Sequence, residues 1–314
     1  MSLRIVFLGT PEFATTSLNA LVNSKHEVVG VVTAPDKPAG RGQQLNESDV
    51  KKFVVQHGLN LFQPEKLRDE SFLDALRNLQ ADVFVVVAFR MLPEAVWNMP
   101  PHGTVNLHGS LLPQYRGAAP IQRAIEMGDT KTGVAIMEME PGLDTGPVLI
   151  DEAIWIANNE TAQSLHDRLA YLGGELIVKA LKLIADNPKL ILHPQDPNRV
   201  TYAHKILKAE AKLDWSNTAE QIDRKVRSLN PAPGASTELN GELVKVWLTR
   251  MPKAESNARD VKPGTILGQG EQGVLVQCGD RPLELLELQN AGGKKITGHQ
   301  WFLGRPKDKT LCFS

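Results

Sequence analysis

Apolar residues alternate between two spacings along the first 186 residues of the chain. Runs of strand length are separated by stretches in which apolar positions recur at the helical period. Such alternation is typical of a mostly parallel sheet wound with helices, so we expect a doubly wound α/β domain over residues 1–186. Its strands are predicted at residues 3–8, 27–33, 82–88, 103–107, 133–139 and 148–156.

Two helices of this domain have further signals in the sequence. Thr10 can cap the first helix with Pro11 at its first position, where proline is favoured. A long amphipathic helix is predicted over residues 162–187 and closes the domain. Residues 34–44 form a polar, glycine-rich stretch that is longer than a usual strand-to-helix connection, which indicates a functional or mobile segment.

The pattern changes after residue 186. Three prolines between residues 188 and 197 disfavour regular structure, so a linker is predicted over residues 187–207. One helix-like segment follows at residues 218–229, and Asn240-Gly241 is a two-residue hairpin signal. Residues 208–314 are therefore expected to form a smaller β-barrel of the oligonucleotide-binding type. Its strand-like runs lie at residues 244–248, 274–277 and 283–288.

A glycine pattern in this second region has another interpretation that we reject. Gly268, Gly270 and Gly273 have the spacing of a dinucleotide-binding loop. That motif requires a helix after the glycines, but the strand-like run 274–277 follows them. We therefore interpret these residues as turn glycines and expect no nicotinamide or flavin site.

Composition narrows the classes of protein that remain. The content is 42% apolar and 23% charged, which is ordinary for a globular chain. The longest apolar run, Val83 to Phe89, is far shorter than the roughly 20 residues that span a membrane. We expect a cytoplasmic protein without a membrane partner. Two cysteines, Cys278 and Cys312, are too few for a disulfide framework or a cysteine-based zinc site, so we predict reduced thiols and no metal.

Charge is divided unevenly between the two regions. The whole chain has a net charge of -1, but residues 1–186 hold 16 Lys and Arg against 22 Asp and Glu, a net -6. Residues 187–314 hold 19 against 14, a net +5. Such asymmetry indicates a polyanionic partner, and the alternative is a chance imbalance on a solvated surface.

The candidate chemistry begins in the predicted strand 103–107. Strand alternation puts Asn106 and His108 on one face, about 6 to 7 Å apart along the chain. Gly109 breaks the strand directly after them, so both lie near its carboxyl end, where open α/β sheets bind their ligands. The alternative is that the two side chains only satisfy hydrogen bonds at the strand end.

Two loops belong to the same interpretation. Residues 110–117 mix apolar side chains with Pro113, Tyr115 and Arg116, so this segment can wrap a flat, partly apolar ligand with an anionic end, or simply connect two elements. Asp144 lies in a tight loop and can close an Asx turn. If Asp144 instead reaches His108, the carboxylate would fix the imidazole tautomer, as in the pairs that catalyse acyl transfer.

These residues carry a resemblance to a known family. Asn106-Leu-His108-Gly-Ser110-Leu-Leu-Pro113, with the later Leu143-Asp144-Thr145-Gly146, resembles the folate-dependent formyltransferases. Segments 37–42, 213–215 and 229–235 are similar to those of members that act on methionyl initiator tRNA. The resemblance covers nearly the whole chain. It implies formyl transfer from 10-formyltetrahydrofolate to the α-amine of methionyl initiator tRNA, without a metal.

The resemblance also implies residue roles. Asn106, His108 and Asp144 would be the catalytic set. The folate pocket would be lined by Phe89, Arg90, Leu92, Ser110, Leu111, Leu112 and Pro113. Arg41 would contact tRNA near its acceptor end, together with Lys37 of the same loop. Basic residues of the second region would face the tRNA backbone, among them Lys205, Lys208, Lys294 and Lys295.

Two departures and two alternatives accompany this hypothesis. Residues 43–49 are less basic than is usual for the family, and Arg90 stands where glycine is common. A formyltransferase for an amino sugar or a purine precursor would share the catalytic set, but it would not need loop 37–42 or a basic second region. A nucleic-acid-binding protein with an inactive α/β domain would not need all three polar catalytic residues. A monomer is expected.

Overall fold

The computed structural model describes residues 1–39, 44–187, 190, 192–253, 261–306 and 310–314. The chain divides into two compact units, and each is built from several segments. The first unit consists of Met1–Pro120, Lys131–Trp155 and His166–Ala203. The second consists of Ile121–Thr130, Ile156–Leu165 and His204–Ser314. That residues 1–186 and 208–314 fold independently of each other stays a prediction.

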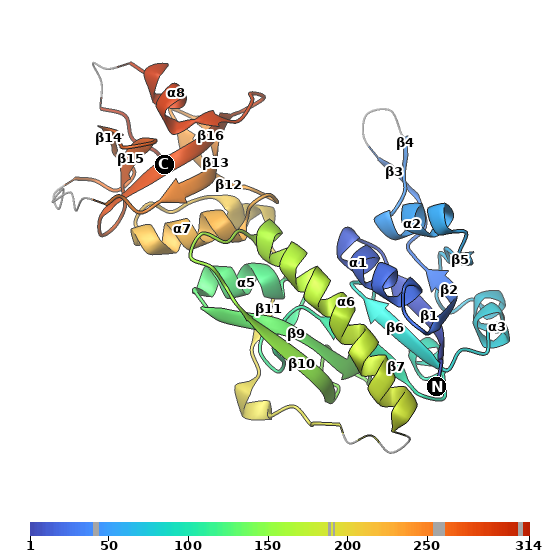
Figure 1. Cartoon of the computed structure of the whole chain (residues 1–314). Helices are drawn as coiled ribbons and strands as arrows, with labels where there is room; N and C mark the ends of the chain where they lie inside the picture. The colour runs from blue at the N-terminus through green and yellow to red at the C-terminus, as the bar shows by residue number, and fades with distance from the viewer. Residues whose placement is uncertain (40–43, 188–189, 191, 254–260, 307–309) are drawn as a thin grey trace. The chain divides into compact units, whose positions relative to one another are not determined.

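The first unit is built on a seven-stranded, mostly parallel sheet, as predicted (Figure 1). Neighbouring strands follow the order β10-β9-β7-β6-β1-β2-β5. The five strands from β7 to β5 in this order pair in parallel, whereas β9 and β10 are antiparallel. The strands are β1 (Arg4–Gly9), β2 (Glu27–Val32), β5 (Leu61–Phe62), β6 (Val83–Val87), β7 (Thr104–His108), β9 (Lys131–Glu138) and β10 (Val148–Trp155). Only the two-residue edge strand β5 was missed from the sequence, because so short a run has no period.

The helices connect these strands. They are α1 (Glu12–Val22), α2 (Asp49–His57), α3 (Glu70–Asn78), α4 (Glu94–Trp97), α5 (Pro120–Met127) and α6 (Ala162–Asp186). The predicted start of α1 was one residue early. Pro11 is extended, at φ -82° and ψ 176°, so it caps the helix and Glu12 is the first helical residue. Because Pro11 takes the cap position, Thr10 does not cap α1.

Close packing brings α6 against β7. A Cβ atom on Gly173 would lie 2.5 Å from the Leu107 side chain, a distance that real Cβ atoms do not show. Leu107 is buried on the face of β7 opposite Asn106 and His108. The helix therefore fixes the back of the strand that holds the candidate catalytic residues.

Two segments predicted as irregular contain regular structure. Residues 34–46 include a hairpin of β3 (Lys37–Ala39) and β4 (Gln44–Asn46), and Arg41 lies outside the described residues. The predicted linker 187–207 includes η1 (Pro197–Arg199) and β11 (Tyr202–Ala203). No proline follows Pro197 in this segment, so β11 is free to pair with β8 (Arg116–Gly117).

The second unit is built on an antiparallel barrel with α7 before it, and it also holds nearly all of α5 and the first turn of α6. The barrel follows the strand order β12-β13-β16-β15-β14, with β17 paired to β16. Asn240 and Gly241 have φ angles of 53° and 82° and form the predicted two-residue hairpin between its first two strands. The elements are η2 (Lys208–Ala211), α7 (Ala219–Ser228), β12 (Ala235–Leu239), β13 (Glu242–Arg250), β14 (Ile266–Gln269), β15 (Val274–Gln277), β16 (Pro282–Asn290), β17 (Ile296–Thr297) and α8 (Gly298–Leu303).

The last residues of the chain close this barrel. Phe313 forms a bridge to Leu239 of β12, and Cys312 forms a bridge to Thr265, just before β14. These are the two edge strands of the sheet order, so the terminal segment joins both free edges. Gly270 and Gly273 lie in the turn between β14 and β15, as predicted, whereas Gly268 lies within β14 and pairs with Leu275, so the prediction of a turn glycine was wrong for Gly268.

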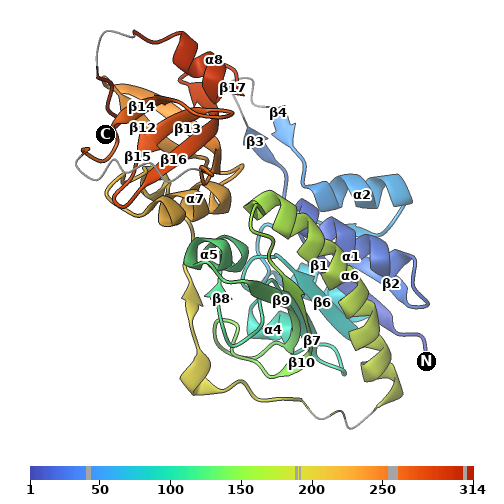
Figure 2. The same cartoon turned by 60° about the vertical axis from the view of Figure 1, so that its left-hand side comes forward.

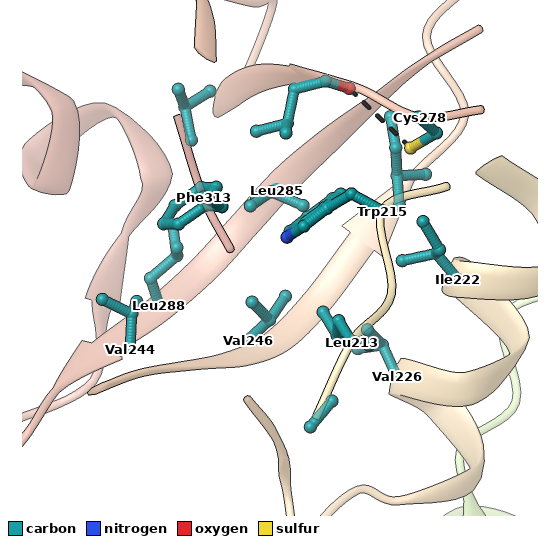
Figure 3. Close-up of a cluster of buried hydrophobic side chains, with 14 of the residues drawn as sticks. Leu213, Trp215, Ile222, Val226, Val244, Val246, Cys278, Leu285, Leu288 and Phe313 are labelled. Atoms are coloured by element: carbon teal, nitrogen blue, oxygen red, sulfur yellow. Dashed lines mark hydrogen bonds between the residues drawn. The ribbon is translucent and has the colours of Figure 1, made fainter. Parts of the chain in front are cut away.

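Mostly aliphatic side chains fill the interior of the barrel, together with the aromatic rings of Trp215, Trp301 and Phe313 (Figure 3). Trp215 is buried, stacks on Phe313 at 5.5 Å between ring centroids, and donates its Nε1–H to Thr237 Oγ1 at 2.9 Å. Cys278 lies in the same cluster, where burial, followed by the charge of Asp280, raises the pKa of its thiol to about 12. Leu213 and Trp215 of the Leu-Asp-Trp segment are thus part of the barrel core, whereas Asp214 between them is exposed.

Candidate active site

Strand β7 positions Asn106 and His108. Asn106 lies between Val86 of β6 and Met137 of β9 in the sheet register, and its side chain is half-buried. His108 is the last residue of the strand and is only 6% exposed. The carboxyl end of the central parallel strands is therefore also the place where these two polar side chains emerge.

His108 makes one contact through each ring nitrogen. Its Nε2 atom lies 2.9 Å from the carbonyl oxygen of Tyr115, and its Nδ1 atom lies 3.7 Å from Oδ2 of Asp144. A carbonyl only accepts hydrogen bonds, so Nε2 must hold a proton. When the ring is protonated, Nδ1–H points at the carboxylate.

Asp144 is held in an uncommon backbone conformation. Its φ is +52°, in the left-handed region, and its side chain is largely buried. The carboxylate accepts the backbone N–H of Gly117 at 2.8 Å. This hydrogen bond joins residues 27 positions apart, whereas an Asx turn would bond the side chain to its own loop. Sequence spacing left the contact between Asp144 and His108 open, and the structure brings the two together.

The segment 110–113 lies directly after β7. Ser110 is fully buried, and its hydroxyl donates to the carbonyl of Gln114 at 2.6 Å. Leu111 lies on β9, since a Cβ atom on Gly133 would come within 2.6 Å of its side chain. Leu112 is partly exposed, Pro113 is buried, and the bond between them is cis. The hydroxyl of Ser110 thus stabilises the loop in which it lies.

Residues 89–92 follow β6, the strand next to β7. Phe89 and Leu92 pack on a buried cluster that includes Val96. Arg90 is exposed and donates to the carbonyls of Glu65 and Pro64, at 2.9 and 2.5 Å. A hollow of about 420 Å³ lies here, lined by Lys66, Leu67, Arg68, Arg90, Met91, Leu92 and Pro93.

This hollow has a basic rim that sequence reasoning missed. Lys66 and Arg68 are exposed and join Arg90 at its edge, while Leu67 and Leu92 are buried below. Lys66 and Arg68 follow β5, the short strand that the sequence pattern did not predict. Recognising β5 would have placed its following loop at the same edge of the sheet as residues 89–92.

The hairpin of β3 and β4 is tied down at its base. Lys51 of α2 binds the carboxylates of Asp36, before the hairpin, and Glu47, after it. Gln63 donates from Nε2 to Asp36 Oδ1 and to the carbonyl of Ala34, both at 2.9 Å. The hydrogen bonds to Asp36 and then Glu47 raise the pKa of Lys51, so it stays charged. Both ends of the hairpin therefore converge on one ammonium group.

The predicted tRNA contacts lie in both units. Lys37 is exposed on β3 in the first unit, and Arg41 lies outside the described residues. In the second unit Lys205, Lys208, Lys294 and Lys295 are all exposed. Lys295 also pairs with Glu287 at 3.4 Å and lies 3.9 Å above the Trp247 ring. The catalytic candidates are brought together, whereas the basic candidates are distributed over both units.

Two kinds of feature are absent from the described residues. In that part of the chain, no group of three or more His, Cys, Asp or Glu side chains could hold a metal ion. Among the helices described there, none is long and apolar enough to cross a membrane.

Comparison with known proteins identifies the family. Residues 3–181 match the model of the formyl transferase family, and residues 205–306 match that of the formyl transferase C-terminal domain. The chain belongs to the formyltransferase family, as its motifs predict. It is 46% identical to the methionyl-tRNA formyltransferase of Polynucleobacter asymbioticus over 99% of each chain. It is 48% identical to that of Stenotrophomonas maltophilia, over 96% of this chain and 98% of the relative.

Solved structures share the fold at low identity. HypX from Aquifex aeolicus in complex with tetrahydrofolic acid aligns with a TM-score of 0.66 at 17% identity, over 100% of this chain and 51% of HypX. The N-formyltransferase from Helicobacter canadensis, in complex with folinic acid and dTDP-3-aminofucose, aligns with a TM-score of 0.64 at 16% identity. It covers 90% of this chain and 99% of its own. These likenesses concern the fold alone.

Proposed function

We propose that this chain transfers the formyl group of 10-formyltetrahydrofolate to the α-amine of methionyl initiator tRNA. The products are N-formylmethionyl-tRNA and tetrahydrofolate. The observation that carries the proposal is the convergence of Asn106, His108 and Asp144 at the end of β7, in a chain related over nearly its whole length to methionyl-tRNA formyltransferases.

The residues suit the chemistry. The amine nitrogen attacks the formyl carbon and forms a C–N bond, which leaves a negatively charged oxygen. The amide N–H of Asn106 donates to this oxyanion, a role typically worth about 100-fold to 1,000-fold in rate. Collapse of the intermediate breaks the bond to N10 of the folate. Nε2 of His108 would carry the proton from the amine to N10 once the substrate takes the place of the Tyr115 carbonyl on that nitrogen, and Asp144 is the counter-charge of the protonated ring.

The folate would lie along residues 89–92 and 110–113. Phe89, Leu92 and the partly exposed Leu111 and Leu112 offer apolar surface to the flat pterin. The glutamyl part of the folate carries carboxylates, and the basic rim formed by Lys66, Arg68 and Arg90 suits them. This agrees with the expected ligand shape, which is flat and partly apolar with an anionic end.

The tRNA would be held by two kinds of contact. Lys205, Lys208, Lys294 and Lys295 would bind backbone phosphates, which supplies affinity without sequence information. Lys37 and Arg41 would act near the acceptor end. The net charge of +5 over residues 187–314 supports the first of these roles. We expect the enzyme to work as a monomer in the cytoplasm, which light scattering and cell fractionation would check.

A comparison of acceptors tests the proposal. Purified protein is supplied with 10-formyltetrahydrofolate and one of three acceptors: methionyl initiator tRNA, methionyl elongator tRNA, or a nucleotide-linked amino sugar. Release of tetrahydrofolate and acid-stable formyl-methionine are both measured. We expect turnover with the initiator to exceed that with the elongator and to be absent with the amino sugar. Preferential formylation of the amino sugar would overturn the assignment.

A further inference from the structure

Gln195 makes four hydrogen bonds to two separate loops of the first unit. Its Oε1 accepts from Nε and Nη2 of Arg116, at 3.0 and 2.7 Å. Its Nε2 donates to the carbonyl oxygens of Asp144 and Gly146, at 2.9 and 2.6 Å. A carboxamide has two N–H donors and one oxygen with two lone pairs, so the whole capacity of this side chain is used.

The orientation of the carboxamide is fixed by its partners. A guanidinium only donates and a backbone carbonyl only accepts, so a flipped Gln195 would lose all four bonds. Arg116 is buried and Gln195 is its partner among the described residues at both nitrogens named above. The four hydrogen bonds can form together in only one relative position of the two loops, so Gln195 stabilises that position.

These hydrogen bonds hold Asp144 through both its side chain and its backbone. Gly117, next to Arg116, donates its N–H to the Asp144 carboxylate, and Gln195 holds both Arg116 and the Asp144 carbonyl. The left-handed φ of Asp144 is sparsely populated for a non-glycine residue and persists only where surrounding contacts hold it. Gln195 provides two of those contacts, on the backbone of the loop.

The segment that carries Gln195 is itself fixed on both sides. His193 and Val148 exchange two backbone hydrogen bonds, both of 2.9 Å. Beyond Gln195, β11 pairs in parallel with β8, and in Figure 2 the yellow strand lies beside β8. Gln195 is therefore presented to the two loops from a segment that has its own backbone pairing.

We infer that Gln195 is a positioning residue, which holds the Asp144 carboxylate in place beside His108. The inference rests on the proposed function, because it assigns the effect of Gln195 to formyl transfer through Asp144. The four hydrogen bonds of Gln195 go to Arg116 and to the backbone of Asp144 and Gly146, and none of them goes to His108. Removal of Gln195 should therefore change turnover and leave the binding of the donor unchanged.

A double-mutant cycle tests this role. Gln195→Ala and Gln195→Glu are each made in the wild-type and Asp144→Ala backgrounds, with Gln221→Ala as the matched control. Gln221 caps α7 in the second unit through hydrogen bonds with Thr218. For each protein, kcat, the KM of each substrate, the pH profile of kcat and the melting temperature are measured.

We expect Gln195→Ala to lower kcat by about 100-fold, the loss that follows a displacement of about 1 Å at a reacting centre. The KM for the donor should stay within about twofold, and the same substitution should cost little more in the Asp144→Ala background. Gln195→Glu keeps the acceptor for Arg116 but cannot donate to the two carbonyls. It should not recover kcat, and its pH profile should follow that of Gln195→Ala.

Three outcomes would overturn the inference. One is a kcat for Gln195→Ala within about threefold of wild type, a loss too small for a displaced group at the reacting centre. Another is an equal fold loss with and without Asp144, which would mark a general structural role. The third is full recovery of kcat by Gln195→Glu, which also decides the matter if the alanine variant does not fold. Wild-type turnover in Asp144→Ala alone would instead defeat the proposed catalytic set, and this inference with it.

Discussion

Nδ1 of His108 lies 3.7 Å from Oδ2 of Asp144, while the opposite ring nitrogen lies 2.9 Å from the carbonyl of Tyr115. Two different loops thus hold the imidazole, one through each nitrogen. The ring cannot turn without losing both contacts, and its orientation relative to Asn106 on the same strand is set. Because Nε2 is bonded to the Tyr115 carbonyl and Nδ1 faces Asp144, proton transfer with a substrate requires the substrate to replace the Tyr115 carbonyl at Nε2.

Loss of any catalytic side chain should reduce turnover much more than donor binding. We expect Asn106→Ala to lower kcat by about 100-fold to 1,000-fold, because it removes a donor to the oxyanion. His108→Ala and Asp144→Ala should also cause large losses, and combinations should be far from additive, since the three act as one unit. Steady-state formylation and calorimetric titration with a folate are the measurements. Near-normal kcat in His108→Ala would refute its role.

The basic rim should bind the carboxylates at the glutamyl end of the donor. Lys66→Ala and Arg68→Ala remove charge without breaking the backbone contacts that Arg90 makes. Each exposed charge pair is worth about 0.2 to 1 kcal/mol, so KM should rise a few-fold for a donor with several glutamates and less for one with a single glutamate. Arg77→Ala on α3 is the control, because Arg77 already pairs with Glu70 and Asp74. Equal changes for both donors would contradict the assignment.

The ion pairs at the base of the β3–β4 hairpin should contribute to kcat/KM for the tRNA acceptor. Lys51→Met removes the ammonium group that holds Asp36 and Glu47 together. We expect kcat/KM for methionyl initiator tRNA to fall by about tenfold through loss of positioning, with donor affinity unchanged. Lys52→Met is a matched control, since Lys52 pairs only with its neighbour Asp49 among the described residues, on an exposed surface. If both variants behave alike, the hairpin base has no special role.

Salt dependence should separate two adjacent lysines. Lys295 shares its charge with Glu287, whereas Lys294 has no carboxylate within ion-pair distance among the described residues. Loss of one phosphate contact flattens the slope of log K against log salt by about one unit. We expect this for Lys294→Ala and a smaller change for Lys295→Ala, equally with initiator and elongator tRNA. Filter binding across a salt series measures it, and unchanged slopes in both variants would exclude the contact.

The barrel should lose stability in acid through Glu284. Burial favours a higher pKa, but the N–H of Gln272, Arg250 and the N–H of Gly273 together lower the pKa of this carboxyl below its ordinary 4.5. A lowered folded-state pKa contributes stability above the unfolded-state pKa, and this contribution is lost as pH falls through the folded-state value.

Glu284→Ala tests that contribution. It leaves buried donors unpaired and should cost on the order of 3 kcal/mol at pH 7, with a correspondingly lower melting temperature. The difference from wild type should shrink as pH falls from about 4.5, the ordinary pKa of the carboxyl, through the lower folded-state pKa. Glu242→Ala, at the exposed hairpin, is the control. A difference that stays constant down to pH 3 would show that the charge of Glu284 does not stabilise the barrel.

The sequence by itself determined the elements and the family. Strand and helix periods are local properties, so β7, α6 and α7 were predicted within a few residues, as was the shared face of Asn106 and His108. The turn chemistry of Asn240 and Gly241 is equally local, because few residues adopt positive φ without strain. The motif around residues 106–113 identified the family because it is contiguous in the chain.

Only the tertiary structure decided which distant residues meet. The contact of Asp144 with His108, the bonds of Gln195, and the closure of the barrel by Phe313 all join positions far apart in the chain. The hydrophobic period of the sequence does not predict such contacts. They depend on the paths of loops, and those paths are set by hydrogen bonds to other loops. Gln195 is the clearest case: in the sequence it lies among prolines that predict a linker, and only its partners show that the segment is part of the site.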